Sequence, residues 1–293
     1  MAIPTAPPFD YKSLFAIENE RLLCVLSSLS VADWQRPTRC PGWDVHGLAL
    51  HLVGGSFSVV SWLRDGFRGT PAPNGLDDLE DLDEQGFIGW LDGLQTAWVE
   101  AARRVSPRLL IELLGWVSVV FDEALSSQDP SAVSAHVSWA GNDPVPVWLD
   151  HARELSEKWI HRQQILEALG EPTDLRPDLA RPVLEALRWA YPYRLGTHTR
   201  ELGTFVEIEI LDELIGQRWM LVSNGTGWVF DDGTPAARVE GVKVGSMSLS
   251  GEQAWRLPTN NYEQAVHGIF HVAGEPDIVA ALTNTRAIIG TAK

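Results

Sequence analysis

The chain changes character near Gly203, and this change limits the folds open to it more than any other feature. Before Gly203, apolar residues recur at helical spacing. After it, short runs of β-branched and aromatic residues alternate with glycine, asparagine and aspartate. The pattern indicates an α+β protein, with a helical domain at 1–195 and a smaller α+β domain at 196–293.

Helices are expected at about 10–30, 44–65, 85–127 with a break near Ser106-Pro107, and 145–169. A further, separate helix is expected to end at about residue 192. Asp44 is expected to cap the second of these. Strands are expected at "TFVEIEIL", "RWMLVS", "GWVF", "ARVEGV" and "SMSLS", and "SNGTG" carries an Asn-Gly hairpin signal. Two more helices are expected at about 251–271 and 275–286.

Charge excludes one class of partner. The chain has 39 acidic and 23 basic residues, a net charge of −16, and no basic cluster. Phosphate backbones repel such a surface, so we expect no nucleic-acid partner. No run approaches the roughly 18 to 20 apolar residues of a membrane span, and no signal peptide is visible at the N-terminus. With two cysteines and no disulfide framework, we expect a cytoplasmic protein without a membrane partner.

"SEKWIHRQQ" places Glu157 four residues before His161, on one face of a predicted helix. Residues at this spacing can share a metal ion. They are also common as charge pairs on exposed helix faces, and an apolar stripe nearly opposite them favours that alternative. The stripe consists of Trp148, Leu155, Trp159 and Leu166. The spacing alone leaves both interpretations open.

His51 has an unusual helix face, which also holds Gly47, Gly54, Gly55 and Ser58. Each glycine within a helix costs about 1 kcal/mol relative to alanine. Either room around a ligand or close packing of a neighbouring helix would explain the cluster. His46 lies on a different face and is expected at the surface.

Two other features are weaker candidates. His267 and His271 are also four residues apart and would bind a metal with a third ligand, for which Glu263 and Glu275 are nearby. The same pair would also suit the flanks of a helix end. Cys40 lies in a turn before a helix with no histidine or lysine near it in sequence, so we expect a structural role. The sequence has no P-loop, dinucleotide-binding glycine motif, nucleophile elbow or C-x-x-C.

Two motifs resemble a known family. "DWQRPTRCPGWDVHGLALHL" is similar to a pattern near the start of the mycothiol-dependent maleylpyruvate isomerases, and "ARELSEKWIHRQQI" resembles their R-x-x-E-x-x-x-H segment. The resemblance implies a DinB-like four-helix bundle holding a divalent metal, followed by a small α/β domain. Its metal ligands map to His51, Glu157 and His161. Where the family often has aspartate three residues after the last ligand, this chain has Gln164, which would make the histidine less basic.

The resemblance also implies chemistry. Three protein ligands leave a position open on the metal, with zinc favoured over nickel, iron or manganese. In the family that position is thought to serve mycothiol, whose thiolate attacks a small electrophile. Addition and expulsion would isomerise a cis-alkene, whereas addition alone would make the enzyme an S-transferase. Arg218 and Arg256 are candidates to bind the thiol or a substrate carboxylate. The alternatives are a non-catalytic metal-binding regulatory or sensor protein, and a thiol-independent hydrolase or transferase.

Overall fold

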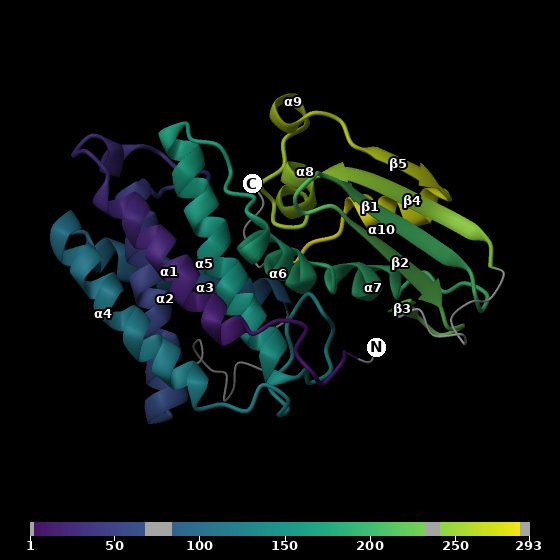
Figure 1. Ribbon diagram of the computed structural model, residues 1–293, viewed down its shortest axis with the longest axis horizontal. Helices are drawn as coiled ribbons and strands as arrows, with labels where there is room; N and C mark the ends of the chain where they lie inside the picture. Colours follow the sequence, from purple (N-terminus) through teal and green to yellow (C-terminus); the bar gives the residue numbers. More distant parts are fainter. Residues whose placement is uncertain (1–2, 68–83, 232–240, 288–293) are drawn as a thin grey trace. The chain divides into compact units, whose positions relative to one another are not determined.

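The computed structural model describes residues 3–67, 84–231 and 241–287 (Figure 1). The chain divides into two compact units, each built from separate segments. We call them the helical unit, with residues 10–129 and 157–173, and the sheet unit, with residues 1–9, 130–156 and 174–293. The predicted boundary at residue 195 stays a prediction. The fold class, α+β with a helical N-terminal part and a C-terminal sheet, is confirmed.

The helical unit contains α1 (Tyr11–Ser27), the short η1 (Asp33–Gln35), α2 (Val45–Asp65), α3 (Glu84–Ala102), α4 (Pro107–Ser126) and the second part of α5 (Val147–Leu169). These bounds confirm the predicted helices, including the break before Pro107. α4 packs against α1 and α2, and α2 also packs against α3.

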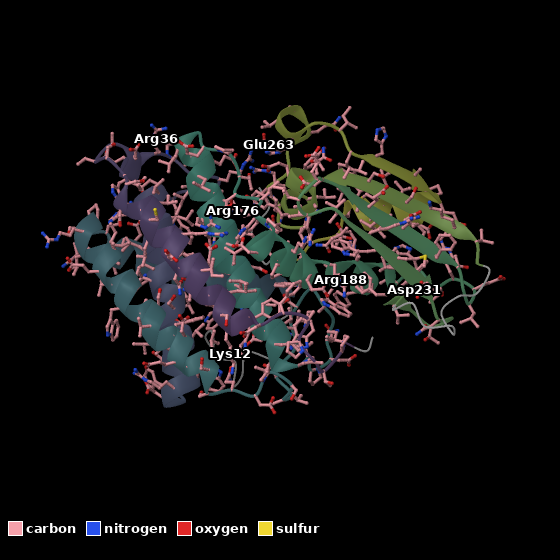
Figure 2. The ribbon with its side chains drawn as sticks, viewed as in Figure 1. Lys12, Arg36, Arg176, Arg188, Asp231 and Glu263 are labelled. Carbon is pink, nitrogen blue, oxygen red and sulfur yellow. The ribbon has the colours of Figure 1, made fainter. Side chains whose placement is uncertain are left out.

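The helix ends follow local sequence rules. Asp44 caps α2 as predicted, because its side chain accepts a hydrogen bond of 2.8 Å from the Gly47 N–H. Gly66 ends α2 in the left-handed conformation, with φ of 64°. Lys12, labelled in Figure 2, donates to the carbonyls of Ser126 and Gln128 at the end of α4.

The second part of α5 carries charged residues that are buried beside its apolar stripe. Glu18 on α1 and Arg162 are 0% and 1% exposed, and they form two hydrogen bonds of 2.7 and 2.8 Å. Lys158 donates to Ser56 Oγ on α2 at 3.1 Å. Charged residues are buried this deeply only when paired. One of the two interpretations left open above, an exposed charge pair at Glu157 and His161, is not supported, because His161 is 9% exposed and Gln164 on the same face is 6% exposed.

In its described residues, the sheet unit holds five strands in the order β3-β2-β1-β4-β5. They are β1 (Phe205–Leu211), β2 (Gln217–Ser223), β3 (Trp228–Phe230), β4 (Lys243–Ser250) and β5 (His271–Gly274). β1 and β4 pair in parallel, and the other pairs are antiparallel. The Asn224-Gly225 hairpin between β2 and β3 is confirmed, with Gly225 at φ of 87°. The predicted strand "ARVEGV" lies largely outside the described residues.

The helices of the sheet unit are α6 (Pro177–Leu187), α7 (Ala190–Leu195), α8 (Gly251–Arg256), α9 (Gln264–His267) and α10 (Pro276–Thr283). The single helix predicted at 251–271 is wrong. The chain takes left-handed backbone conformations at Asn260 (φ 59°) and Gly268 (φ 74°), which a continuous helix excludes. His267 therefore ends α9, whereas His271 begins β5.

Within the described residues, α2 is the one helix whose length and composition would allow it to cross a membrane. In its most apolar window, 56% of the residues are buried inside the protein. A core helix of a globular protein has the same composition, and Val45, Leu48 and Ala49 are each 0% exposed.

Candidate metal centre

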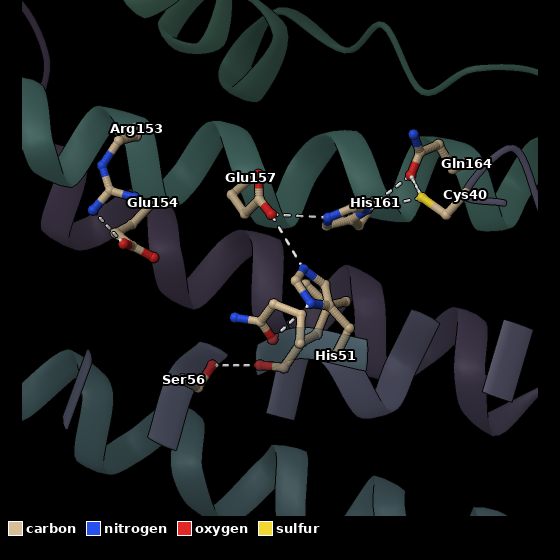
Figure 3. Close-up of polar contacts among 10 residues, drawn as sticks. Cys40, His51, Ser56, Arg153, Glu154, Glu157, His161 and Gln164 are labelled. Carbon is tan, nitrogen blue, oxygen red and sulfur yellow. Dashed lines mark hydrogen bonds and ion pairs between the residues drawn. The ribbon is translucent and has the colours of Figure 1, made fainter. Parts of the chain in front are cut away.

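Helices α2 and α5 bring the three predicted ligands together (Figure 3). His51 lies on α2, and Glu157 and His161 lie one turn apart on α5. Glu157 Oε1 is 3.2 Å from His51 Nε2 and 2.9 Å from His161 Nε2. One nitrogen or oxygen of each residue lies within 4.8 Å of the other two. In the described part of the chain, no other group of three or more His, Cys, Asp or Glu side chains converges in this way.

Two glutamines orient the imidazoles. His161 Nδ1 is 2.7 Å from Gln164 Oε1, and His51 Nδ1 is 3.1 Å from Gln95 Oε1 on α3. An amide oxygen only accepts hydrogen bonds, so both Nδ1 atoms carry the proton and both Nε2 atoms face Glu157. Gln164 thus contacts the other nitrogen of its histidine, as the sequence motif suggested. Gln95 carried no sequence signal, because it comes from a third helix with no fixed spacing from His51.

The metal-free site is an ion pair. Burial alone would raise the pKa of Glu157, but the charge of His161 and hydrogen bonds from both imidazoles hold it well below its usual 4.5. Burial alone would lower the pKa of His161, but Glu157 and the nearby Cys40 raise it well above its usual 6.5. A cation at this position would therefore compete with a proton for Nε2 of His161.

Cys40, which is far from Glu157 and His161 in sequence, lies next to the site in the fold. Its sulfur is 3.1 Å from Gln164 Oε1 and 3.9 Å from His161 Nδ1. No histidine is near Cys40 in sequence, but α5 brings His161 to it in the fold, and the structural role expected of Cys40 stays a prediction. Cys40 contacts the acceptor that orients His161, so its sulfur lies behind the ligand atoms rather than among them.

Close packing explains one of the glycines on the His51 face of α2, Gly54. A Cβ on Gly54 would lie 2.4 Å from Nε1 of Trp98, whose N–H donates to the Leu50 carbonyl at 2.8 Å. Gly54 therefore admits a tryptophan of α3, as the packing interpretation predicts. A Cβ on Gly55 would meet nothing within 4 Å. His51 itself lies beside Trp43, with ring centroids 4.9 Å apart.

The donor set fits a divalent cation. Ligand atoms about 2.0–2.1 Å from a tetrahedral ion lie roughly 3.3 Å from one another. The distances from Glu157 Oε1 to the Nε2 atoms of His161 and His51, 2.9 and 3.2 Å, are close to this value. A metal-binding imidazole usually donates its other ring N–H to an outer acceptor, and Gln164 and Gln95 accept from Nδ1 of His161 and His51 in this way. Two imidazoles and one carboxylate leave a further position open, which is the pattern of catalytic rather than structural zinc sites.

The other candidate residues belong to the sheet unit. Arg218 forms an ion pair with Glu207 between β2 and β1, and Arg256 is 5% exposed and donates to Glu252 at 2.7 Å. The role of both arginines in binding stays a prediction. The rival metal site is not formed within the described residues: His267 and His271 belong to no group of three converging ligands, and His267 Nδ1 accepts a hydrogen bond of 2.9 Å from the N–H of Glu263, the residue before α9.

Comparison with known proteins supports the same family as the motifs. Residues 15–166 match the family model of the mycothiol maleylpyruvate isomerase N-terminal domain. The crystal structure of a mycothiol-dependent maleylpyruvate isomerase aligns with a TM-score of 0.53 and 14% identity, covering 93% of this chain and 95% of that one. A mutant of a mycothiol-dependent maleylpyruvate isomerase aligns with a TM-score of 0.49 and 13% identity, over 87% and 88% of the two chains. No curated protein sequence matches the chain.

The two kinds of likeness carry different weight. At 14% identity, the structural likeness establishes a shared fold and no more. The family model covers just over half of the chain and includes His51, Glu157 and His161. The chain therefore belongs to the mycothiol maleylpyruvate isomerase family.

Proposed function

We propose that this protein is a divalent-metal enzyme that uses mycothiol to attack a small electrophile. The observation that carries the proposal is the convergence of His51, Glu157 and His161 on one point between α2 and α5. Membership of the family supports the thiol and an isomerase-like activity. We further propose a cytoplasmic protein that binds neither nucleic acid nor membranes, in keeping with its net charge of −16.

The protein would hold the metal through three side chains and fix two of them from behind. Gln95 and Gln164 accept the Nδ1 protons, so that each Nε2 keeps its lone pair for the metal. When bound, the metal would supply the charge that deprotonates a thiol, whose usual pKa is about 8.5. Zinc is the preferred candidate, with nickel, iron or manganese as alternatives.

The reaction follows from thiolate chemistry. The sulfur adds to one carbon of a conjugated cis-alkene, and the double bond becomes a rotatable single bond. Expulsion of the same thiolate after rotation restores the double bond in the trans form, with no net change in composition. If the adduct is protonated and released instead, the product is an S-conjugate. Arg218 and Arg256 are proposed as contacts for the thiol or for a substrate carboxylate.

The test is turnover of two electrophiles by the zinc-loaded protein, each with and without mycothiol. Maleylpyruvate reports cis-to-trans isomerisation, and monochlorobimane reports S-conjugation, detected by mass spectrometry. We expect product from at least one of them only when mycothiol is present. Glu157→Gln should abolish it, because the shared carboxylate is lost. Glu167→Gln is the matched control, since Glu167 lies on the same helix but pairs with Arg39 and is not one of the three converging ligands.

The alternatives give different results. Zinc binding without turnover of either electrophile would contradict an enzyme of this kind and favour a regulatory or sensor protein. Turnover that is equally fast without mycothiol would indicate a thiol-independent hydrolase or transferase. Equal loss of activity in Glu157→Gln and Glu167→Gln would argue against the three-residue site.

A further inference from the structure

The helical unit contains a cavity on a different face of α2 from the proposed metal site. It has a volume of about 770 Å³, which is within the range of small-molecule sites. Its walls are the end of α1, η1, the start of α2 and the corner between α3 and α4. His46 lines this cavity, whereas His51, five residues later on α2, faces Glu157.

The bottom of the cavity is apolar. Leu26 and Trp34 line it and are 1% and 5% exposed. Ile111 and Val105 line it from α4 and the segment before it. His46 contributes little polarity, because its Nε2 is 2.8 Å from the Val105 carbonyl oxygen and its ring lies edge-on to Trp34. A flat ring or a short alkyl chain would find apolar surface here.

Arginines outnumber carboxylates among the residues that line the cavity, although the chain as a whole carries −16. Arg103, Arg104 and Arg108 line its rim, against the carboxylates of Asp44 and Glu112. Arg103 is occupied, since it donates to Glu100 at 3.1 Å and lies 3.7 Å from Asp44.

The two remaining arginines can take a ligand at little cost. Arg104 makes no hydrogen bond or ion pair within the described ranges of the chain. Arg108 pairs with Glu112, but its side chain is 90% exposed, and an ion pair this exposed stabilises little.

Helix geometry adds to the positive potential. The corner of the cavity includes Ser106 and Pro107, the cap and first residue of α4. The N-terminus of a helix this long carries a partial positive charge that favours anions. An anionic group at the rim would therefore meet Arg104, Arg108 and the start of α4 together.

We propose that this cavity is a second ligand site, and that it binds a small amphipathic carboxylate. The carboxylate would lie at Arg104 and Arg108, because guanidinium groups match its geometry. The apolar body of the ligand would lie on Leu26 and Trp34. The site is independent of the metal and of the proposed thiol chemistry.

The test is isothermal titration calorimetry of the full-length protein with 2-naphthoate, and with 2-naphthalenemethanol as an uncharged ligand of the same shape. We expect 2-naphthoate to bind once per chain and more tightly than the alcohol, equally with zinc or with EDTA. Arg104→Gln should weaken 2-naphthoate about tenfold and leave the alcohol unchanged. Arg64→Gln is the control, because Arg64 is a half-exposed arginine of the same unit that pairs with Asp65.

A second variant locates the ligand without relying on charge. Ser27 is exposed at the end of α1 and lines the cavity, so Ser27→Trp should fill the space and abolish binding of both ligands. Loss of 2-naphthoate binding in EDTA would place the ligand at the metal and overturn the proposal. So would the absence of any binding, unchanged binding in both Arg104→Gln and Ser27→Trp, or equal weakening in Arg64→Gln.

Discussion

Replacing Gln164 tests whether the proposed metal site depends on residues behind the ligands. Gln164 is 6% exposed, and its Oε1 is 2.7 Å from His161 Nδ1. Once Nε2 binds a metal, the proton must stay on Nδ1 and needs an acceptor. Gln164→Leu removes that acceptor and leaves a buried N–H without a partner in the metal-bound state.

The magnitude follows from this geometry. Loss of the outer partner of a metal-binding histidine typically costs 10–100-fold in metal affinity, or about 1.4–2.8 kcal/mol. The value agrees with the roughly 1–3 kcal/mol cost of a buried donor left without an acceptor. Gln95→Leu should fall nearer the lower end, because its contact with His51 is longer, at 3.1 Å. Gln164→Asp should change the affinity in the opposite direction, since a carboxylate makes the imidazole more basic.

The assay is a zinc titration against a chromophoric chelator, with each variant first shown to be folded by circular dichroism. Gln35→Leu is the control, because Gln35 is an exposed amide in the same unit that contacts none of the ligands. The reasoning is refuted if Gln164→Leu binds zinc as tightly as the parent, or if Gln35→Leu loses as much affinity.

Three further predictions follow from the same contacts. Cys40→Ser should change zinc affinity by less than about threefold, because the thiol is only a weak donor to Gln164 and does not contact the metal position. A loss of about tenfold would indicate that Cys40 binds the metal. In urea denaturation, Gly54→Ala should lower the free energy of unfolding by about 1–3 kcal/mol, because the added Cβ overlaps the indole of Trp98. Gly55→Ala should raise it by up to about 1 kcal/mol. Equal effects of the two variants would contradict this account of the packing. In metal-free protein, the pKa of His161 is raised, so its pairing stabilises the fold fully below about pH 6.5 and loses this effect as the pH rises. The pKa of Glu157 is lowered, so its pairing stabilises the fold above about pH 4.5 and loses this effect in acid. Stability should therefore fall as the pH rises above about 6.5, and an unchanged fall in Glu157→Gln would refute this assignment.

The sequence predicted the helices of the helical unit well, because periodicity, caps and breakers agree there. Asp44, Ser106 and Pro107 mark helix ends that the structure confirms. Prediction failed between α8 and β5, where the backbone turns at Asn260 and Gly268 divide an expected helix into two short helices and a strand, whereas the helix expected at about 275–286 is present as α10. Left-handed conformations of this kind leave no periodic signal, so helical spacing of the histidines there was misleading.

The site was harder to predict than the helices that carry it. Helical spacing placed Glu157 and His161 on one face, but it also indicated that this face is solvent-exposed. That inference treated polar residues as surface residues, whereas His161 and Gln164 on this face are buried, at 9% and 6% exposed. The partners of the histidines, Gln95 and Cys40, come from other parts of the chain, so only the tertiary structure shows them.

The most direct measurement is the amount of metal bound per chain, determined by elemental analysis after zinc supplementation. It compares the parent protein with His51→Ala, Glu157→Ala and His161→Ala, and with Glu167→Ala as the control on the same helix. We predict about one equivalent of metal in the parent and in the control, and its loss in each of the other three variants. Metal that is retained in those three variants, or is absent from the parent, would contradict the proposed metal centre.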